Sequence, residues 1–460
     1  MSIREVLRGH RASIAVAAVG AAFGSLLLTT LDGLERSLSA DPAAENHGQF
    51  MVLLDLTAGI FFGIALFVGA VVTANTFSAV VAGRTGTIAL YRLLGASTRS
   101  QRVAFLREGA LAGVIGSTIG VVAGTGLGAI LLGLLTQWMG IPPTPFSAPP
   151  SVALSFLAGV GATTAAAWSG SRAVLAVSPL QALEAAQEPP YGASRSRVVR
   201  TVLGLVLVAA GVASIVLGII QGTKDPNGVG YTFLGGVLSF SGLIASANLF
   251  VPRALVLVGK LFGSRPEARL ARANALRSPD RSTRASIGIV IGVALVTLMS
   301  VGLATVREIS ASMVSVDASL GPLLSIVTAV GVSLVGFSIV IAAIGVISDL
   351  SVSVVQRRRE IGLLRALGFT GQQVRRMILL EAAQSAITSL LLGLLLGVVY
   401  GWAGTQTVFS SVVPTGIVIP TIPPALIVAL VIGTAALTLT AAVVPARRTT
   451  TIAPIDALQR

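Results

Sequence analysis

Few residues in this chain of 460 could do covalent or metal chemistry, and their types exclude several classes of site. There is no cysteine, so disulfides, thiolate metal sites and cysteine nucleophiles are ruled out. The two histidines, His10 and His47, each stand alone in a loop. Neither Lys224 nor Lys260 is followed by Ser or Thr, as the phosphate-binding loop of an ATPase requires. The chain therefore has no P-loop of its own and no metal site that we can identify.

The most informative charged stretch runs from Gln356 to Gly368 and reads QRRREIGLLRALG. Glu360, Leu364 and Leu367 recur at helical spacing, which predicts a short amphipathic helix at the membrane surface that ends at the glycine. A simple positively charged anchor would account for the arginines. It would not account for an acid, two glycines and an ordered apolar face.

The elements that must position this stretch are membrane helices. Hydrophobic residues make up 54% of the chain, charged residues 11%, and the mean hydropathy is +0.89. A soluble domain carries about 25% charged residues. The net charge of +14 comes from short basic clusters between apolar runs, with few aromatics, which argues against nucleic acid as a partner.

Apolar runs of the length that a membrane crossing needs, about 20 residues, occur ten times. The first run is longer than the apolar core of a signal peptide, so we expect it to be retained as a span. The ten predicted spans are approximately 14–31, 52–79, 109–135, 151–170, 199–220, 232–252, 286–306, 323–348, 377–403 and 424–444.

Basic residues fall almost entirely in alternate loops. Of the 32 arginines and lysines, only Arg36, Lys224 and Arg307 lie in the intervening loops. The positive-inside rule then places both termini in the cytoplasm. We expect a multi-pass protein of the bacterial plasma membrane. We expect residues 141–150 and 413–424 to face outward.

The chain repeats itself with a shift of 273 residues, which aligns Arg92 with Arg365, Gly95 with Gly368 and Glu108 with Glu381. The predicted fold is an all-α integral membrane protein with ten transmembrane helices, in which two parallel four-helix repeats are joined by a helix pair. The repeats span 1–185 and 265–460, and the connecting pair of helices spans 186–264.

Glycines recur every four residues in spans three and nine. Small residues let membrane helices approach closely, so these positions predict helix packing. A helix that slides against its partner is an alternative reading that stays open. The glycines are Gly116, Gly120, Gly124 and Gly128, and in the second copy Gly393, Gly397 and Gly401.

The stretch from Arg357 to Gly368, followed by Glu381, resembles the cytoplasmic signature of the FtsX/MacB-like permeases, the membrane subunits of type VII ABC systems. The first copy departs from it, with Thr87 in place of Glu360 and Ala89 in place of Gly362. The resemblance implies ATPase-coupling roles for Arg357, Arg358, Arg359, Glu360, Ile361, Gly362, Leu364, Arg365, Ala366, Leu367 and Gly368, and for Arg84, Leu90, Arg92 and Gly95.

The same resemblance implies a non-catalytic permease. ATP and Mg would be bound by a separate cytoplasmic ABC ATPase, with two copies per chain, and no cofactor by this chain. We expect it to export or extract an amphiphile, such as a lipid, lipopeptide or hydrophobic peptide, in contact with membrane lipid. The family often carries an outer domain after the first span of a unit, but here residues 32–51 and 307–322 leave little room for one.

Three other functions compete with this one. A mechanotransmitting subunit could control an extracytoplasmic protein such as a cell-wall hydrolase, with an extracytoplasmic lipoprotein supplying the missing outer domain. A secondary transporter would need broken helices or charged groups at the midplane. An enzyme would need a convergent acid, base and nucleophile. The first alternative stays open, and the sequence gives no support to the other two.

Overall fold

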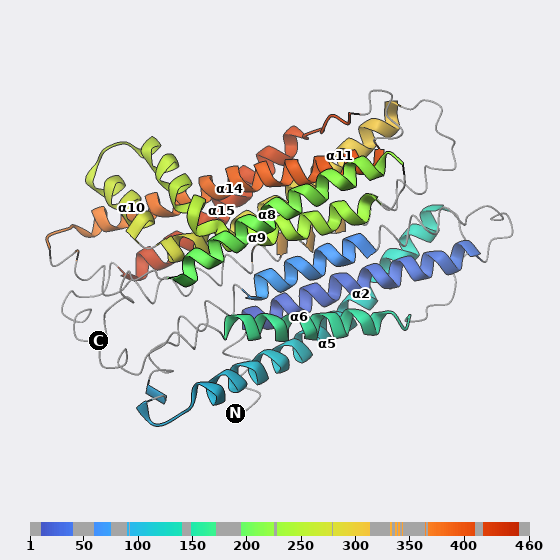
Figure 1. The fold of residues 1–460 in the computed structure, drawn as a ribbon, viewed down its shortest axis with the longest axis horizontal. Helices are drawn as coiled ribbons and strands as arrows, with labels where there is room; N and C mark the ends of the chain where they lie inside the picture. Colours follow the sequence, from blue (N-terminus) through green and yellow to red (C-terminus); the bar gives the residue numbers. More distant parts are fainter. Residues whose placement is uncertain are drawn as a thin grey trace. The chain divides into compact units, whose positions relative to one another are not determined.

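The computed structural model describes most of the membrane helices and little of the loops (Figure 1). Every regular element in the described residues is helical, which confirms the predicted all-α class. The described residues are 11–39, 59–74, 90–91, 93–139, 149–171, 195–224, 228–277, 279–312, 332–333, 336–337, 339–340, 343, 364, 367–409 and 417–449.

One compact unit is built around α2 (Arg11–Ser39), which packs against α5 (Thr98–Met139) and α6 (Val152–Gly170). Helix Gly59–Ala74 and the described residues between 332 and 343 belong to the same unit. A stack of Phe337 on Phe23 of α2, with ring centroids 4.8 Å apart, attaches this part of predicted span eight. A segment of the second sequence copy therefore packs against the first span of the first copy.

The second compact unit contains the remaining helices. In it α8 pairs with α9, and α11 pairs with α14. Its elements are α8 (Arg195–Gly222), α9 (Gly228–Gly259), η2 (Lys260–Phe262), α10 (Pro266–Arg277), α11 (Pro279–Ser312), α14 (Gly371–Phe409) and α15 (Pro424–Thr449). Proline at the first position of α10, α11 and α15 suits a helix start, because its missing N–H would have no helical partner there.

The central helix of each unit is its most enclosed one. In the apolar windows of α2 and α11, 61% and 67% of residues are buried, against 28% and 33% in α5 and α14. Some of the buried serines and threonines donate their hydroxyl to the main chain of their own helix, as Thr30 does to Leu26 O at 2.8 Å. Such back-bonding lets polar residues occupy an apolar interior.

Seven described helices are long and apolar enough to cross a membrane, and two shorter apolar ones run over Gly59–Ala74 and Pro424–Ala436. They coincide with nine of the ten predicted spans, and most of the tenth, 323–348, lies outside the described residues. The boundaries of the two repeats and of the connecting helix pair stay predictions. So does the orientation of the termini.

One helix was not foreseen. The segment between predicted spans six and seven was expected to be a loop, but it contains α10. Its buried alanines, Ala268, Ala271 and Ala275, follow helical spacing, and the helix packs against α9 and α14. Alanine carries too little hydrophobicity to reveal such a face against a charged background.

Candidate functional site

The candidate site is a corner, present once in each compact unit, where a short helical segment turns into a long membrane helix. In the first copy the turn is closed by Gly95, with φ +95°, and by a hydrogen bond from Ala96 N–H to Tyr91 O of 2.9 Å. This bond and the left-handed glycine make a Schellman cap, for which glycine is the favoured residue because it lacks a Cβ.

The second copy makes the same turn. Gly368 has φ +96°, and Phe369 N–H donates to Leu364 O at 3.0 Å. Each of these residues lies 273 positions after its counterpart in the first copy. The two corners therefore share one backbone geometry, although the sequences leading into them differ.

Each corner continues directly into a capped helix. Ser97 accepts a hydrogen bond from Ser100 N–H at 3.1 Å at the start of α5. At the start of α14, Thr370 accepts from Gln373 N–H at 3.2 Å, and Gln373 Oε1 accepts from Thr370 N–H at 2.9 Å. The second pair forms a full capping box, which satisfies two helix-end donors instead of one. The corner of the second copy is the more firmly capped of the two.

Apolar side chains project from both corners. Leu94 is 76% exposed and its counterpart Leu367 is 72% exposed, each immediately before the left-handed glycine. Leu90, Tyr91 and Leu93 are also exposed in the first copy. Clustered exposed apolar residues at a fixed turn are suited to burial by a partner protein.

Several residues expected at this site lie outside the described residues. Their coupling roles stay predictions, as do those of the described Leu90, Gly95, Leu364, Leu367 and Gly368. The undescribed ones are Arg84, Arg92, Arg357, Arg358, Arg359, Glu360, Ile361, Gly362, Arg365 and Ala366.

The corners lie beyond the hydrocarbon core because their helices are too long for it. α5 has 42 residues and α14 has 39, which makes each roughly 60 Å long at 1.5 Å per residue. The apolar core of a bilayer is about 30 Å thick. The first turns of these helices carry charged residues such as Arg99 and Arg375, so they extend from the membrane to the corner.

Within the membrane, the glycines of α5 lie against the backbone of α2. A Cβ built on Gly116 would stand 2.6 Å from Ile14 O, and one on Gly120 or Gly124 would collide with the carbonyl oxygens of Ala18 and Ala22. The second copy repeats the arrangement between α14 and α11. There a Cβ on Gly397 would stand 2.6 Å from Ala294 O.

The pair α8 and α9 is attached to α14 by hydrogen bonds at three levels. Thr232 bonds to Thr407 at 2.7 Å, Ser239 to the Tyr400 hydroxyl at 2.9 Å, and Gln384 Nε2 to Leu255 O at 2.6 Å. From the first bond to the third, the residue number on α9 rises by 7 and then by 16. The residue number on α14 falls by the same two steps. The helices are thus antiparallel and held in one register.

The equivalent face of α5 has no such polar residues. Leu111, Leu127 and Leu134 stand 273 positions before Gln384, Tyr400 and Thr407, and all three are exposed. The helix pair therefore covers a polar face of α14 in the second copy. The equivalent positions of α5 in the first copy are exposed leucines. Sequence reasoning missed this difference, although a comparison of the two copies at this spacing could have found it.

The contact between α8 and α9 was also missed in the sequence. It is made by glycines seven residues apart, Gly204, Gly211 and Gly218 on α8, which face Gly242, Gly235 and Gly228 on α9. This seven-residue spacing differs from the four-residue spacing that drew attention to spans three and nine.

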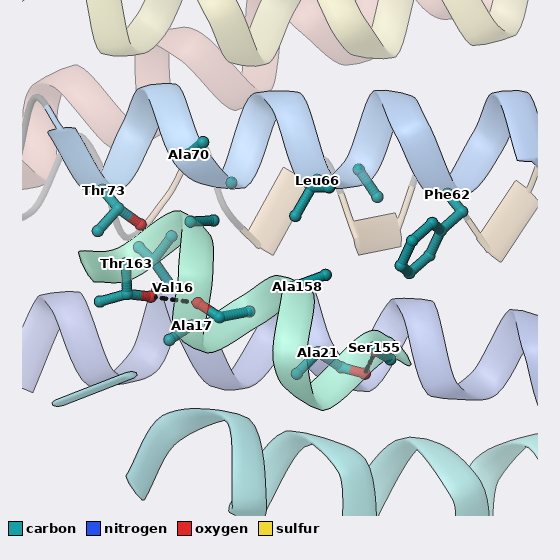
Figure 2. Close-up of a pocket in the computed structure, with 15 residues that line it drawn as sticks. Val16, Ala17, Ala21, Phe62, Leu66, Ala70, Thr73, Ser155, Ala158 and Thr163 are labelled. Atoms are coloured by element: carbon teal, nitrogen blue, oxygen red, sulfur yellow. Dashed lines mark hydrogen bonds between the residues drawn. The ribbon is translucent and has the colours of Figure 1, made fainter. Parts of the chain in front are cut away.

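The first unit also contains a small apolar cavity between α2, helix Gly59–Ala74 and α6 (Figure 2). Its volume is about 30 Å³, and most of its lining is alanine and glycine, with Phe62 and Leu66 at one side. The hydroxyl of Ser155 donates to Ala21 O at 3.0 Å, and that of Thr163 to Gly159 O at 2.7 Å. A space of about one water molecule cannot hold an amphiphile.

In the described part of the chain, no cluster of three His, Asp or Glu side chains could hold a metal ion.

Two regions of the chain match one known protein family. The family of the FtsX-like permease C-terminal domain matches residues 59–179 and 332–454, together just over half of the chain. The chain belongs to the FtsX-like permease family. The two matches begin 273 residues apart, the same shift that relates the two corners of this FtsX-like permease.

Curated relatives of this FtsX-like permease carry ABC transporter names. It is 33% identical over 97 residues to the uncharacterized ABC transporter permease YknZ of Bacillus subtilis (strain 168), covering 21% of this chain and 23% of the relative. It is 28% identical over 141 residues to the macrolide export ATP-binding/permease protein MacB of Rhodopirellula baltica, covering 29% and 18%.

A third relative is the ABC transporter permease YtrF of Bacillus subtilis (strain 168), 32% identical over 68 residues, which covers 15% of this chain and 16% of the relative. The chain thus spans less than a quarter of the length of these relatives. They support the family assignment and leave activity and partners to be proposed.

Proposed function

We propose that this chain is the membrane subunit of an ABC transporter, and that a separate ATPase drives it to export or extract an amphiphile. The observation that carries the proposal is the pair of matching corners. In both, a Schellman turn at a left-handed glycine leads into a long membrane helix, with an exposed leucine beside the turn. One ATPase copy would bind at each corner, which gives two copies per chain.

The corner suits this role because it transmits displacement. A left-handed glycine, a Schellman bond and a helix cap leave the short helix little freedom relative to α5 or α14. A push on the exposed leucines would therefore tilt the long helix. Closure of two ATPase copies on ATP and Mg would move both corners together.

The proposed cargo follows from the lack of charge. Between Glu381 and Arg447 the chain carries no charged residue, which leaves no obvious site for an ionic substrate along α14 and α15. An apolar or amphiphilic molecule that stays in contact with lipid needs no charged pathway. A lipid, a lipopeptide and a hydrophobic peptide all meet this description.

The test is co-expression with the cognate ABC ATPase. The chain alone should not hydrolyse ATP, and native mass spectrometry of the complex should give two ATPase copies per chain. Reconstitution in vesicles with a labelled lipopeptide should then show ATP-dependent transfer between leaflets. A stable one-to-one complex would contradict the model of two coupling corners. Coupled ATP hydrolysis without transfer of any amphiphile would favour a mechanotransmitting subunit instead.

A further inference from the structure

Residues 417–423, which lead into α15, are not helical and are held in place by hydrogen bonds to side chains of α14 and α11. Val418, which is 2% exposed, donates its N–H to Gln406 Oε1 at 2.7 Å and accepts from Trp402 Nε1 at 2.8 Å. Three residues later, Thr421 N–H donates to Thr305 Oγ1 at 3.0 Å. Side chains of α14 and α11 thus take up backbone groups that a loop would normally leave to water.

This attachment forces isoleucines outward. Val418 is buried while its two neighbours, Ile417 and Ile419, are exposed, so the neighbours' side chains point away from the helices. They are 65% and 81% exposed, and Ile422 is exposed as well. We call Ile417, Ile419 and Ile422 the isoleucine platform. Its backbone is fixed in advance, so the platform would lose little entropy on binding.

The depth of the platform can be read along α14. Glu381 is the last charged residue of that helix, and Trp402 follows it by 21 residues, or about 31 Å at 1.5 Å per residue. This distance equals the thickness of a bilayer core, about 30 Å. Trp402 is therefore at the opposite membrane boundary, where tryptophan is enriched. Because Trp402 bonds to Val418 O, the platform lies at that boundary too.

We propose that the isoleucine platform inserts into the lipid leaflet at the end of α14 opposite the Gly368 corner. Lipid is favoured over a protein partner because the chain carries no charged residue between Glu381 and Arg447, so the segment that bears the platform offers none to orient a docked protein. The platform would anchor the outer ends of α11 and α14 at a fixed depth. The inference is independent of the proposed transport function.

The absence of cysteine allows a direct test with single labels. A nitroxide label is attached to the cysteine of the Ile419→Cys variant of the full chain. The labelled protein is reconstituted in vesicles of phosphatidylethanolamine and phosphatidylglycerol. Oxygen, which partitions into lipid, should collide with this label several-fold more often than a water-soluble nickel chelate does. Leu395→Cys, on an exposed face of α14, is the lipid control. Lys224→Cys is the aqueous control, because Gly222 beside it packs against the backbone of Thr407 near the same end of α14.

A second variant tests whether the hydrogen bonds to Val418 hold the platform in place. Gln406→Met removes the acceptor of Val418 N–H, so the label at position 419 should become more mobile while the rest of the chain stays folded. If the nickel chelate reaches the label at position 419 as easily as the one at position 224, the platform is in water and the proposal fails. Protection from both oxygen and nickel would show a protein cover and would overturn it as well.

Discussion

Ser239 of α9 and Tyr400 of α14 share a hydrogen bond of 2.9 Å in the middle of the second compact unit. The Tyr400 ring also meets Phe240 edge-on, with centroids 6.0 Å apart. The neighbouring levels, Thr232 with Thr407 and Gln384 with Leu255, keep the same register. The helix pair α8–α9 is thus a fixed part of the unit that contains α14.

This bond predicts a measurable coupling between its two residues. In a double-mutant cycle of Ser239→Ala and Tyr400→Phe, thermal unfolding in detergent should give a coupling energy near the membrane-protein average of about 0.6 kcal/mol. Tyr231→Phe is the matched control, because that ring is exposed on the same helix as Ser239. Strictly additive effects would mean that the two hydroxyls do not meet.

The glycine face of α5 predicts that a single methyl group will matter at one position and not at another. Gly124→Ala places its Cβ against Ala22 O and the Ser25 hydroxyl, so α2 and α5 must separate. Overpacking of this kind typically costs about 1–3 kcal/mol. Gly126→Ala, two residues along the same helix, meets nothing within 4 Å and should leave the melting temperature unchanged or higher. Equal melting temperatures for the two variants would contradict this packing.

The two left-handed glycines predict the same backbone cost of substitution in the two corners. Gly95→Ala and Gly368→Ala should each cost about 1–2 kcal/mol, because a Cβ disfavours this conformation. Gly95→Asn and Gly368→Asn should cost less, since asparagine tolerates positive φ better. Pull-down of the ATPase and stimulated ATP hydrolysis would measure the effect on coupling. A loss that asparagine does not reduce would show that backbone conformation is not the cause.

Because the first copy departs from the family signature, we predict that the two cytoplasmic loops contribute unequally to ATPase coupling. Glu360→Lys should weaken assembly with the ATPase or coupled ATP hydrolysis by about tenfold, a change that needs only about 1.4 kcal/mol. Thr87→Lys should do less, because its neutral hydroxyl makes no ion pair. The two variants are compared side by side in the same complex. Equal losses, or a larger loss at Thr87, would show that the first copy couples as strongly.

The loop charges predict the orientation of the chain. Single cysteines introduced by Ser147→Cys and Ser411→Cys should react with an impermeant thiol reagent on intact cells. Ser196→Cys, at the start of α8, should react only after the membrane is opened. The reverse pattern would place both termini outside.

The sequence by itself determined the fold class, the nine spans that the described helices match and the positions of the two corner glycines. Long apolar runs can be stable only in lipid, so composition alone indicated the membrane and the α-helical class. The corner glycines were visible because a helix that ends and restarts needs a residue that accepts positive φ, and Gly95 and Gly368 stood at the same place in both copies.

The tertiary structure decided which faces meet. Gln384 is one polar residue in an apolar helix, and only the fold shows that its amide reaches Leu255 O while its counterpart Leu111 stays exposed. Ile419 likewise becomes a surface feature only because Gln406 and Trp402 hold Val418 inward. Hydrophobicity and spacing report the tendency of one segment to enter the membrane. They do not report the register between segments, which is fixed by close packing and by hydrogen bonds between distant residues.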